Sequence, residues 1–170
     1  MFCSFDAEGK IFLYKKVEHK FVPNSVPTWG WFSPKEDRAQ IHRLDGRMDT
    51  SQYLQLLAGA LTGKLRNDGV NFIHDHHPVH KSRVVAQWFR ENDFVHVLPW
   101  PKNFGSIMPM ETVWDDMLQR LEGTTVSSTE ELWENVCLCF TQLCSNDYLK
   151  TVTSQIPNKL LKIIETNSLM

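Results

Sequence analysis

Alternating hydrophobic and polar positions predict strands in the first part of the chain. Three short segments have this pattern, residues 10–17, 28–33 and 39–44, and breaks rich in Pro, Gly or Asp separate them. Strands that follow one another this closely usually lie side by side in a sheet. We therefore expect a meander of three antiparallel strands before the first helix.

Hydrophobic residues spaced three and four positions apart predict helices further along. The expected helices are 52–61, 82–91, one that begins at Pro109, one from the Ser128 capping box to about residue 143, and short closing helices near 149–151 and 158–165. The apolar side chains expected to face the core are Val84, Val85, Trp88 and Phe89 in the second helix, and Met110, Val113, Trp114, Met117, Leu118 and Leu121 in the third.

Two further apolar segments, residues 70–74 and 94–98, flank the helix 82–91. The second is mostly apolar and bounded by prolines, as a buried parallel strand would be. A strand, a helix and a second parallel strand form a βαβ crossover. The complete order predicts an α/β protein with a ribonuclease-H-like fold, in which helices flank a mixed five-stranded sheet.

Composition limits the classes of protein that fit. The 170 residues are 42% hydrophobic, enough for one domain with a substantial core, and the net charge of −2 disfavours a broad basic DNA-binding face. The four cysteines, Cys3, Cys137, Cys139 and Cys144, have no paired metal-ligand spacing, so we expect reduced thiols. No apolar run is long enough for a membrane span, and the first residues do not resemble a signal peptide.

Asp75 and Glu111 are the candidate functional residues. Asp75 directly follows the apolar segment 70–74, and a carboxylate beyond the carboxyl end of a parallel strand lies where ligands bind. Glu111 lies in the first turn of its expected helix, where the helix dipole stabilises negative charge. With 35 residues between them, the two carboxylates come from different elements. A fold that brings them together provides ligands for a divalent metal ion.

Several motifs, in order along the chain, resemble transposases of the mariner superfamily. They are WGWFS at 29–33, LDGRMD at 44–49, FIHDHHPVH at 72–80, VLPWP at 97–101, MPMETVW at 108–114 and SQIPNKL at 154–160. The resemblance covers nearly the whole chain. It implies that residues 1–170 are a single DDE transposase catalytic domain of ribonuclease-H-like fold, in which Asp75 and Glu111 are the second and third catalytic acids.

The resemblance also implies a mechanism and partners. Asp75, Glu111 and a further acid would hold two Mg²⁺ or Mn²⁺ ions for DNA cleavage and strand transfer. The expected partners are DNA, as transposon ends and target, and a second copy of the chain in a homodimer. The expected location is the nucleus.

The chain departs from the family pattern at its beginning. The first catalytic aspartate of the family would fall just before Met1, and Asp6 is the nearby substitute, in an unfavourable register. The N-terminal helix-turn-helix DNA-binding domain is absent, so we expect an N-terminally truncated chain that is uncertain as an enzyme. His76 stands where the family has Asn.

Two other functions fit the sequence. The chain could be an inactive relic that serves as a nucleic-acid-binding or dimerisation module, with Lys81, Arg83, Arg90 and Lys102 as candidates to contact phosphates. The other is a zinc hydrolase built on His74, His76, His77 and His80. Within the transposase hypothesis, His80 is the best candidate to orient a metal ligand.

Overall fold

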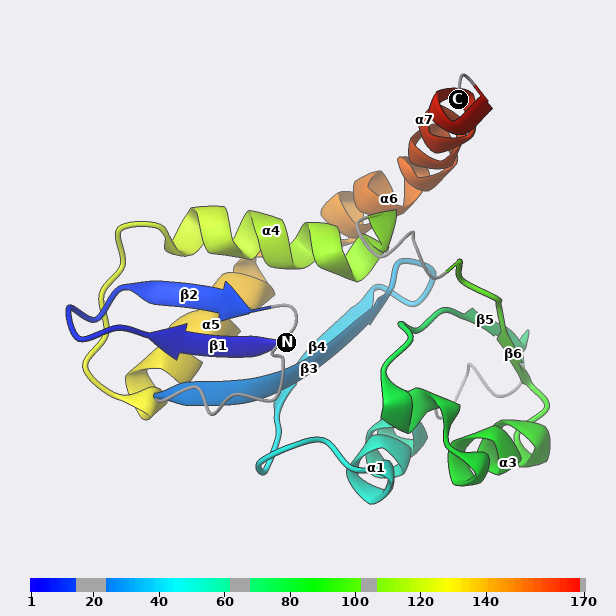
Figure 1. Cartoon of the computed structure of the whole chain (residues 1–170), viewed down its shortest axis with the longest axis horizontal. Coiled ribbons are helices and arrows are strands. Elements are labelled where there is room, and N and C mark those ends of the chain that lie inside the picture. The colour runs from blue at the N-terminus through cyan, green and yellow to red at the C-terminus, as the bar shows by residue number, and fades with distance from the viewer. Residues whose placement is uncertain (15–23, 62–67, 102–106, 169–170) are drawn as a thin grey trace. The chain divides into compact units, whose positions relative to one another are not determined.

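The computed structural model describes residues 1–14, 24–61, 68–101 and 107–168, and contacts divide the chain into two compact units (Figure 1). Unit 1 comprises Met1–Leu44 and Ser106–Met170, and unit 2 comprises Asp45–Gly105. Each unit has its own secondary structure and its own buried residues. The mixed α/β class expected from the sequence is confirmed.

Unit 1 contains an antiparallel sheet of four strands. The strands are β1 (Phe2–Phe5), β2 (Ile11–Tyr14), β3 (Ser25–Ser33) and β4 (Arg38–Arg43), and their order in the sheet is β2-β1-β3-β4. Every neighbouring pair is antiparallel. β3 is long enough to pair with β1 through residues 25–27 and with β4 through residues 28–33 (Figure 1).

Four helices complete unit 1. They are α4 (Pro109–Leu121), α5 (Thr129–Leu143), α6 (Asn146–Ser154) and α7 (Ile156–Ser168). α4 contacts β2 and β3, α5 contacts β1, β3 and β4, and the last two helices continue from them (Figure 1). Buried side chains from the sheet and from α4 and α5 form one core cluster: Cys3, Ile11, Val26, Val113, Trp114, Met117, Leu121, Val126, Leu132, Val136, Cys139, Phe140 and Leu143.

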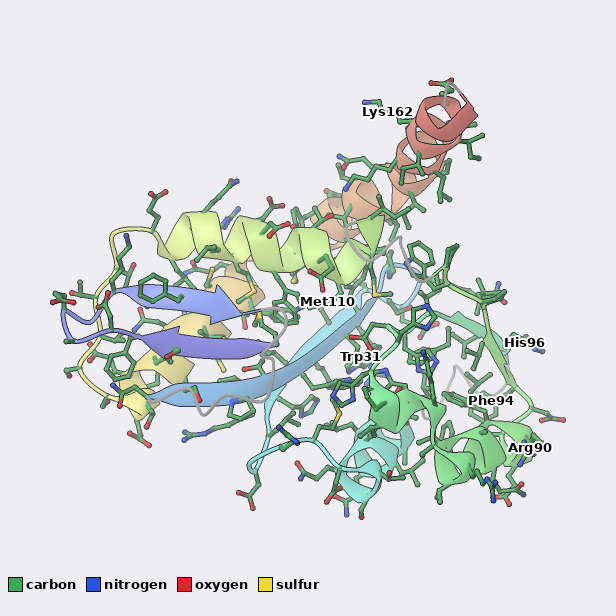
Figure 2. The ribbon with its side chains drawn as sticks, viewed as in Figure 1. Trp31, Arg90, Phe94, His96, Met110 and Lys162 are labelled. Carbon is green, nitrogen blue, oxygen red and sulfur yellow. The ribbon has the colours of Figure 1, made fainter. Side chains whose placement is uncertain are left out.

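The absence of a side chain at Gly30 lets α4 pack closely on β3. A Cβ atom at this position would lie 2.7 Å from Cη2 of Trp114 and 2.9 Å from Cε of Met110. Met110, labelled in Figure 2, lies on the first turn of α4 and packs against the core cluster. Because these contacts hold the first turn on the sheet, they also fix the rotation of Glu111, the next residue.

Local capping explains where the helices of unit 1 begin. α4 has Pro109 in its first turn, as predicted, where the missing N–H costs no helical hydrogen bond. α5 starts at the predicted cap, with the Ser128 hydroxyl accepting from the N–H of Glu131 at 3.1 Å. The return bond of the expected capping box is shifted by one residue, since the Glu131 carboxylate accepts from the N–H of Ser127.

Unit 2 contains α1 (Thr50–Ala60), β5 (Val70–Phe72), the short 3-10 helix η1 (Pro78–Lys81), α3 (Arg83–Glu91) and β6 (Val95–Val97). β5 and β6 pair in parallel across α3, so the predicted βαβ crossover is confirmed. α1 packs on η1 and α3. Side chains before α1 and α3 cap these helices, because they accept hydrogen bonds from the N–H groups of the first turns.

The sheet differs from the prediction. The described strands form one sheet of four and one of two, in place of a single mixed sheet of five. β1 was not predicted, because Phe2–Phe5 is too short to show a period, and its pairing with β3 joins residues far apart in the sequence. β3 begins earlier than predicted, since Pro27 is accommodated within it. The predicted residues 15–17 lie outside the described part of the chain.

Some residues predicted to be buried are exposed. Val84 is 57% exposed and Leu118 is 38% exposed, although each lies on the predicted apolar side of its helix. In β6 Val95 is buried, whereas His96 and Val97 are exposed. The apolar run 94–98 therefore does form a parallel strand, but not one covered along its whole length. The helical period predicts an apolar face, but residues at the edge of that face can still be exposed to solvent.

The four cysteines Cys3, Cys137, Cys139 and Cys144 are free thiols, as predicted. Burial raises the pKa of the Cys3 thiol to about 11, although a hydrogen bond with Thr28 works against this effect. Cys3 is thus a core residue with little thiolate character. Among the described helices, none combines the length and the apolar character that crossing a membrane requires.

Candidate functional site

Asp75 lies just beyond the carboxyl end of β5, as the sequence predicted. Two hydrogen bonds join the end of β5 and the residues that follow it to the residues that follow β6. The N–H of Leu98 donates to the carbonyl of Phe72 at 2.8 Å, and Nε2 of His76 donates to the carbonyl of Trp100 at 2.6 Å. Asp75 therefore lies at the carboxyl edge of a parallel strand pair, which is where α/β proteins bind ligands.

Both hydrogen bonds to the Asp75 carboxylate end on the same oxygen. Nδ1 of His80 lies 2.7 Å from Oδ1, and the N–H of His77 donates to Oδ1 at 3.0 Å. The side chain is 59% exposed. Within the described residues, Oδ2 receives no hydrogen bond. One oxygen is thus held by the protein while the other remains available to a cation.

The surroundings favour the charged form of Asp75. Burial alone would raise the pKa of this carboxyl. The hydrogen bond and electrostatic attraction of His80, with the hydrogen bond from the His77 N–H, outweigh burial and hold the pKa well below its usual range. An ionised carboxylate is the form that binds a metal ion.

The His80 ring is buried in an aromatic stack. Its side chain is 5% exposed. The Tyr53 ring lies 4.1 Å from it between centroids, at an angle of 29°, and the His74 ring lies 4.9 Å away at 5°. Within the described residues, Nδ1 of His80 has the Asp75 carboxylate and carbonyl as partners, whereas the buried Nε2 atom has none.

Tyr53 and His74 support this stack. Tyr53 comes from α1 and is fully buried. Burial, reinforced by the nearby His80, lowers the pKa of His74 to about 4, although Asp75 acts in the opposite direction. His74 is therefore uncharged at neutral pH, and its Nδ1 shares a hydrogen bond of 2.8 Å with the Tyr53 hydroxyl. No functional role was expected for Tyr53, because its spacing in α1 is that of a core residue.

The histidines do not form the zinc site considered as an alternative. His74, His76 and His80 bind Tyr53, Trp100 and Asp75 as described above, and Nδ1 of His77 accepts from the N–H of Val79 at 3.3 Å. Among the residues whose positions are described, no three His, Cys, Asp or Glu side chains are arranged to hold a metal ion together. Each of the four histidines instead has a partner in local structure.

Glu111 lies in the first turn of α4, in unit 1, as predicted. Its N–H donates to the carbonyl of Met108 at 2.9 Å, which closes that turn. The side chain is partly exposed. Asp75 belongs to unit 2, so each carboxylate is positioned by contacts within its own unit.

Asp6, the suggested substitute for a missing acid, has a structural task. It follows β1, and its Oδ1 accepts from the N–H groups of Glu8 at 3.1 Å and Lys10 at 2.8 Å. These bonds close the turn between β1 and β2, in which Gly9 has a φ of 81°. Turn formation is thus sufficient reason for an aspartate at position 6.

The basic residues considered for phosphate contacts lie along α3 and next to it. Lys81, Arg83 and Arg90 are exposed, and Lys102 lies outside the described residues. The Arg90 guanidinium, labelled in Figure 2, donates to Oε1 of Gln87 at 2.6 Å and 3.2 Å. Phosphate contacts by these residues stay a prediction.

Known proteins resemble this chain over almost its whole length. The Transposable element Tc1 transposase of Caenorhabditis elegans is 24% identical over 177 residues, which cover 96% of this chain and 64% of that protein. The Tcb1 transposase of Caenorhabditis briggsae gives the same identity and shares over 185 residues. The Tcb2 transposase of the same species is 24% identical over 166 residues, covering 96% of this chain and 58% of the relative. No family model matches the chain.

These relatives confirm the resemblance that the motifs indicated. The chain is similar to transposases of the Tc1 type. It spans less than two thirds of the length of the curated relatives it matches.

Proposed function

We propose that this chain is the catalytic core of a DDE-type transposase with a ribonuclease-H-like fold. It would act on DNA in the nucleus, cutting at transposon ends and joining them to a target. Two findings support the proposal: the relation to Tc1-type transposases and the surroundings of Asp75. The activity, the DNA substrate and a homodimeric state are parts of the proposal.

The observation that carries the proposal is the state of the Asp75 carboxylate. It lies at the carboxyl edge of the β5–β6 pair, its Oδ1 is held by His80 and His77, and more than half of its side chain is exposed. A helix-capping or loop aspartate does not need a buried histidine to orient it. A metal ligand does need such a partner.

Glu111 would provide the second carboxylate. Its position in the first turn of α4 places it at the positive end of the helix dipole. Carboxylate oxygens are the donors that Mg²⁺ and Mn²⁺ prefer, so both residues fit the expected ions. When bound, such an ion supplies the positive charge that stabilises phosphodiester cleavage. The chain itself would orient the carboxylates and keep Asp75 ionised.

Titration with Mn²⁺ tests this assignment. We expect Asp75→Asn and Glu111→Gln each to weaken Mn²⁺ binding by about 10-fold or more, because each removes a charged ligand. Asp115→Asn is the matched control for Glu111, since Asp115 is an exposed acid on the same helix. The control should retain the affinity of the unmodified chain.

Mn²⁺ binding that survives both substitutions would show that the site is elsewhere. DNA binding without any effect of Mn²⁺ or of these substitutions would favour the other candidate, a nucleic-acid-binding module that does not cut.

A further inference from the structure

His80 presents two nitrogens with opposite surroundings. Nδ1 lies 2.7 Å from Oδ1 of Asp75 and 3.2 Å from the Asp75 carbonyl oxygen. Both partners accept, so Nδ1 carries the hydrogen and donates. Nε2 is buried and, within the described part of the chain, has no partner.

Packing alone does not explain a histidine at position 80. The ring packs against both Tyr53 and His74, in face-to-face contacts that a purely hydrocarbon ring would make equally well. What a histidine adds at this position is the hydrogen bond that Nδ1 donates to Asp75.

We propose that His80 is the positioning residue for Asp75: it holds the carboxylate through Oδ1 and leaves Oδ2 available to a divalent cation. This inference rests on the proposed function, in which Asp75 is a metal ligand. It assigns His80 an indirect task, because a nitrogen that donates to a carboxylate does not bind the metal itself.

The surrounding structure prevents the His80 ring from turning away. η1 begins at Pro78, and the N–H of His80 donates to the carbonyl of His77 at 3.0 Å, which places residue 80 one turn after Asp75. Tyr53, fully buried on α1, stacks on the His80 ring. It also forms a hydrogen bond with His74, the other ring that packs on His80. Because these contacts already hold the His80 ring in one orientation, little further side-chain conformational entropy is lost when it orients Asp75.

Two substitutions separate positioning from packing. His80→Phe keeps the ring and removes both nitrogens, so it should preserve stability while weakening Mn²⁺ binding by about 10-fold. His80→Asn places an amide N–H near the former Nδ1 and removes most of the ring. It should lower the unfolding midpoint and yet retain Mn²⁺ affinity to within about 3-fold, since the amide N–H restores the hydrogen bond that matters for the metal ligand.

Both affinity for Mn²⁺ and the midpoint of denaturant unfolding are measured for each folded variant. His96→Phe is the control, because His96 is an exposed histidine on β6 (Figure 2). It should change neither quantity. Asp75→Asn is included in the same series.

The inference is supported if His80→Phe keeps the unfolding midpoint but binds Mn²⁺ weakly, and if His80→Asn has a lower unfolding midpoint but keeps its affinity for Mn²⁺. If His80→Phe binds Mn²⁺ like the unmodified chain while Asp75→Asn does not, the inference is wrong and the proposed function stands. If Asp75→Asn also binds normally, both are wrong. Affinities that simply follow stability across the two His80 variants would likewise overturn the positioning role.

Discussion

Trp114→Ala lowers the free energy of unfolding by about 3–5 kcal/mol, the range for removing a buried aromatic side chain. Trp114 is 6% exposed, and its ring meets both Gly30 on β3 and Phe140 on α5. Alanine would leave a cavity where α4 packs on the sheet, and α4 carries Glu111. Denaturant unfolding followed by circular dichroism measures the loss, and hydrogen exchange should locate it in β3, α4 and α5.

Leu118→Ala is the matched control on the same helix. Its side chain is 38% exposed, so we expect a loss of less than about 1 kcal/mol. A loss of that small size for Trp114→Ala would contradict the packing of α4 on β3. Equal losses for both variants would contradict the orientation of α4.

Tyr53→Ala has a similarly large effect in unit 2, about 3–5 kcal/mol. The ring is fully buried and stacks on His80 at 4.1 Å, and its hydroxyl forms a hydrogen bond with Nδ1 of His74. Removal of the side chain leaves a cavity beside His80 and breaks the hydrogen bond with His74. We therefore expect hydrogen exchange to increase in η1 and in the chain around Asp75, and the same denaturant series gives the free energy.

Two further variants separate the contribution of the Tyr53 hydroxyl to stability from that of its ring. Tyr53→Phe removes only the hydroxyl and should cost about 1 kcal/mol, the typical value for one hydrogen bond. Gln55→Ala changes an exposed residue of the same helix and should cost less than about 0.5 kcal/mol. A full loss with Tyr53→Phe would mean that the hydrogen bond, rather than the stack, holds the cluster.

Local signals allowed much of the helical structure to be predicted. The cap before α5 and the proline at the start of α4 act within a few residues of the chain, so they can be recognised in the sequence without knowledge of the fold. The βαβ unit was predictable for a related reason. Two apolar segments on either side of a helix have few other ways to pair.

Long-range pairing was harder to predict. β1 is four residues long, and its place between β2 and β3 depends on partners up to 25 residues away. The exposure of Val84 and Leu118 depends on which neighbours cover each helix, and the period of the sequence does not contain that information.

The candidate site also combines residues that local sequence signals predicted with a contact that they did not. Asp75 and Glu111 were predicted from their neighbours in the sequence, and His80 from its closeness to Asp75 along the chain. The stack of Tyr53 on His80 joins residues from two separate elements, α1 and η1. A tyrosine at core spacing gives no sign of such a contact.

The central proposal is that Asp75 and Glu111 are each a ligand of a divalent cation. Fe²⁺, used in place of Mg²⁺ with ascorbate and peroxide, cleaves the backbone next to its ligands, and mass spectrometry identifies the cut sites. We expect cuts beside residue 75 that are lost in Asp75→Asn, and cuts beside residue 111 that are lost in Glu111→Gln. The absence of cuts beside either carboxylate, or cuts beside a carboxylate that persist after its own substitution, would contradict the proposal.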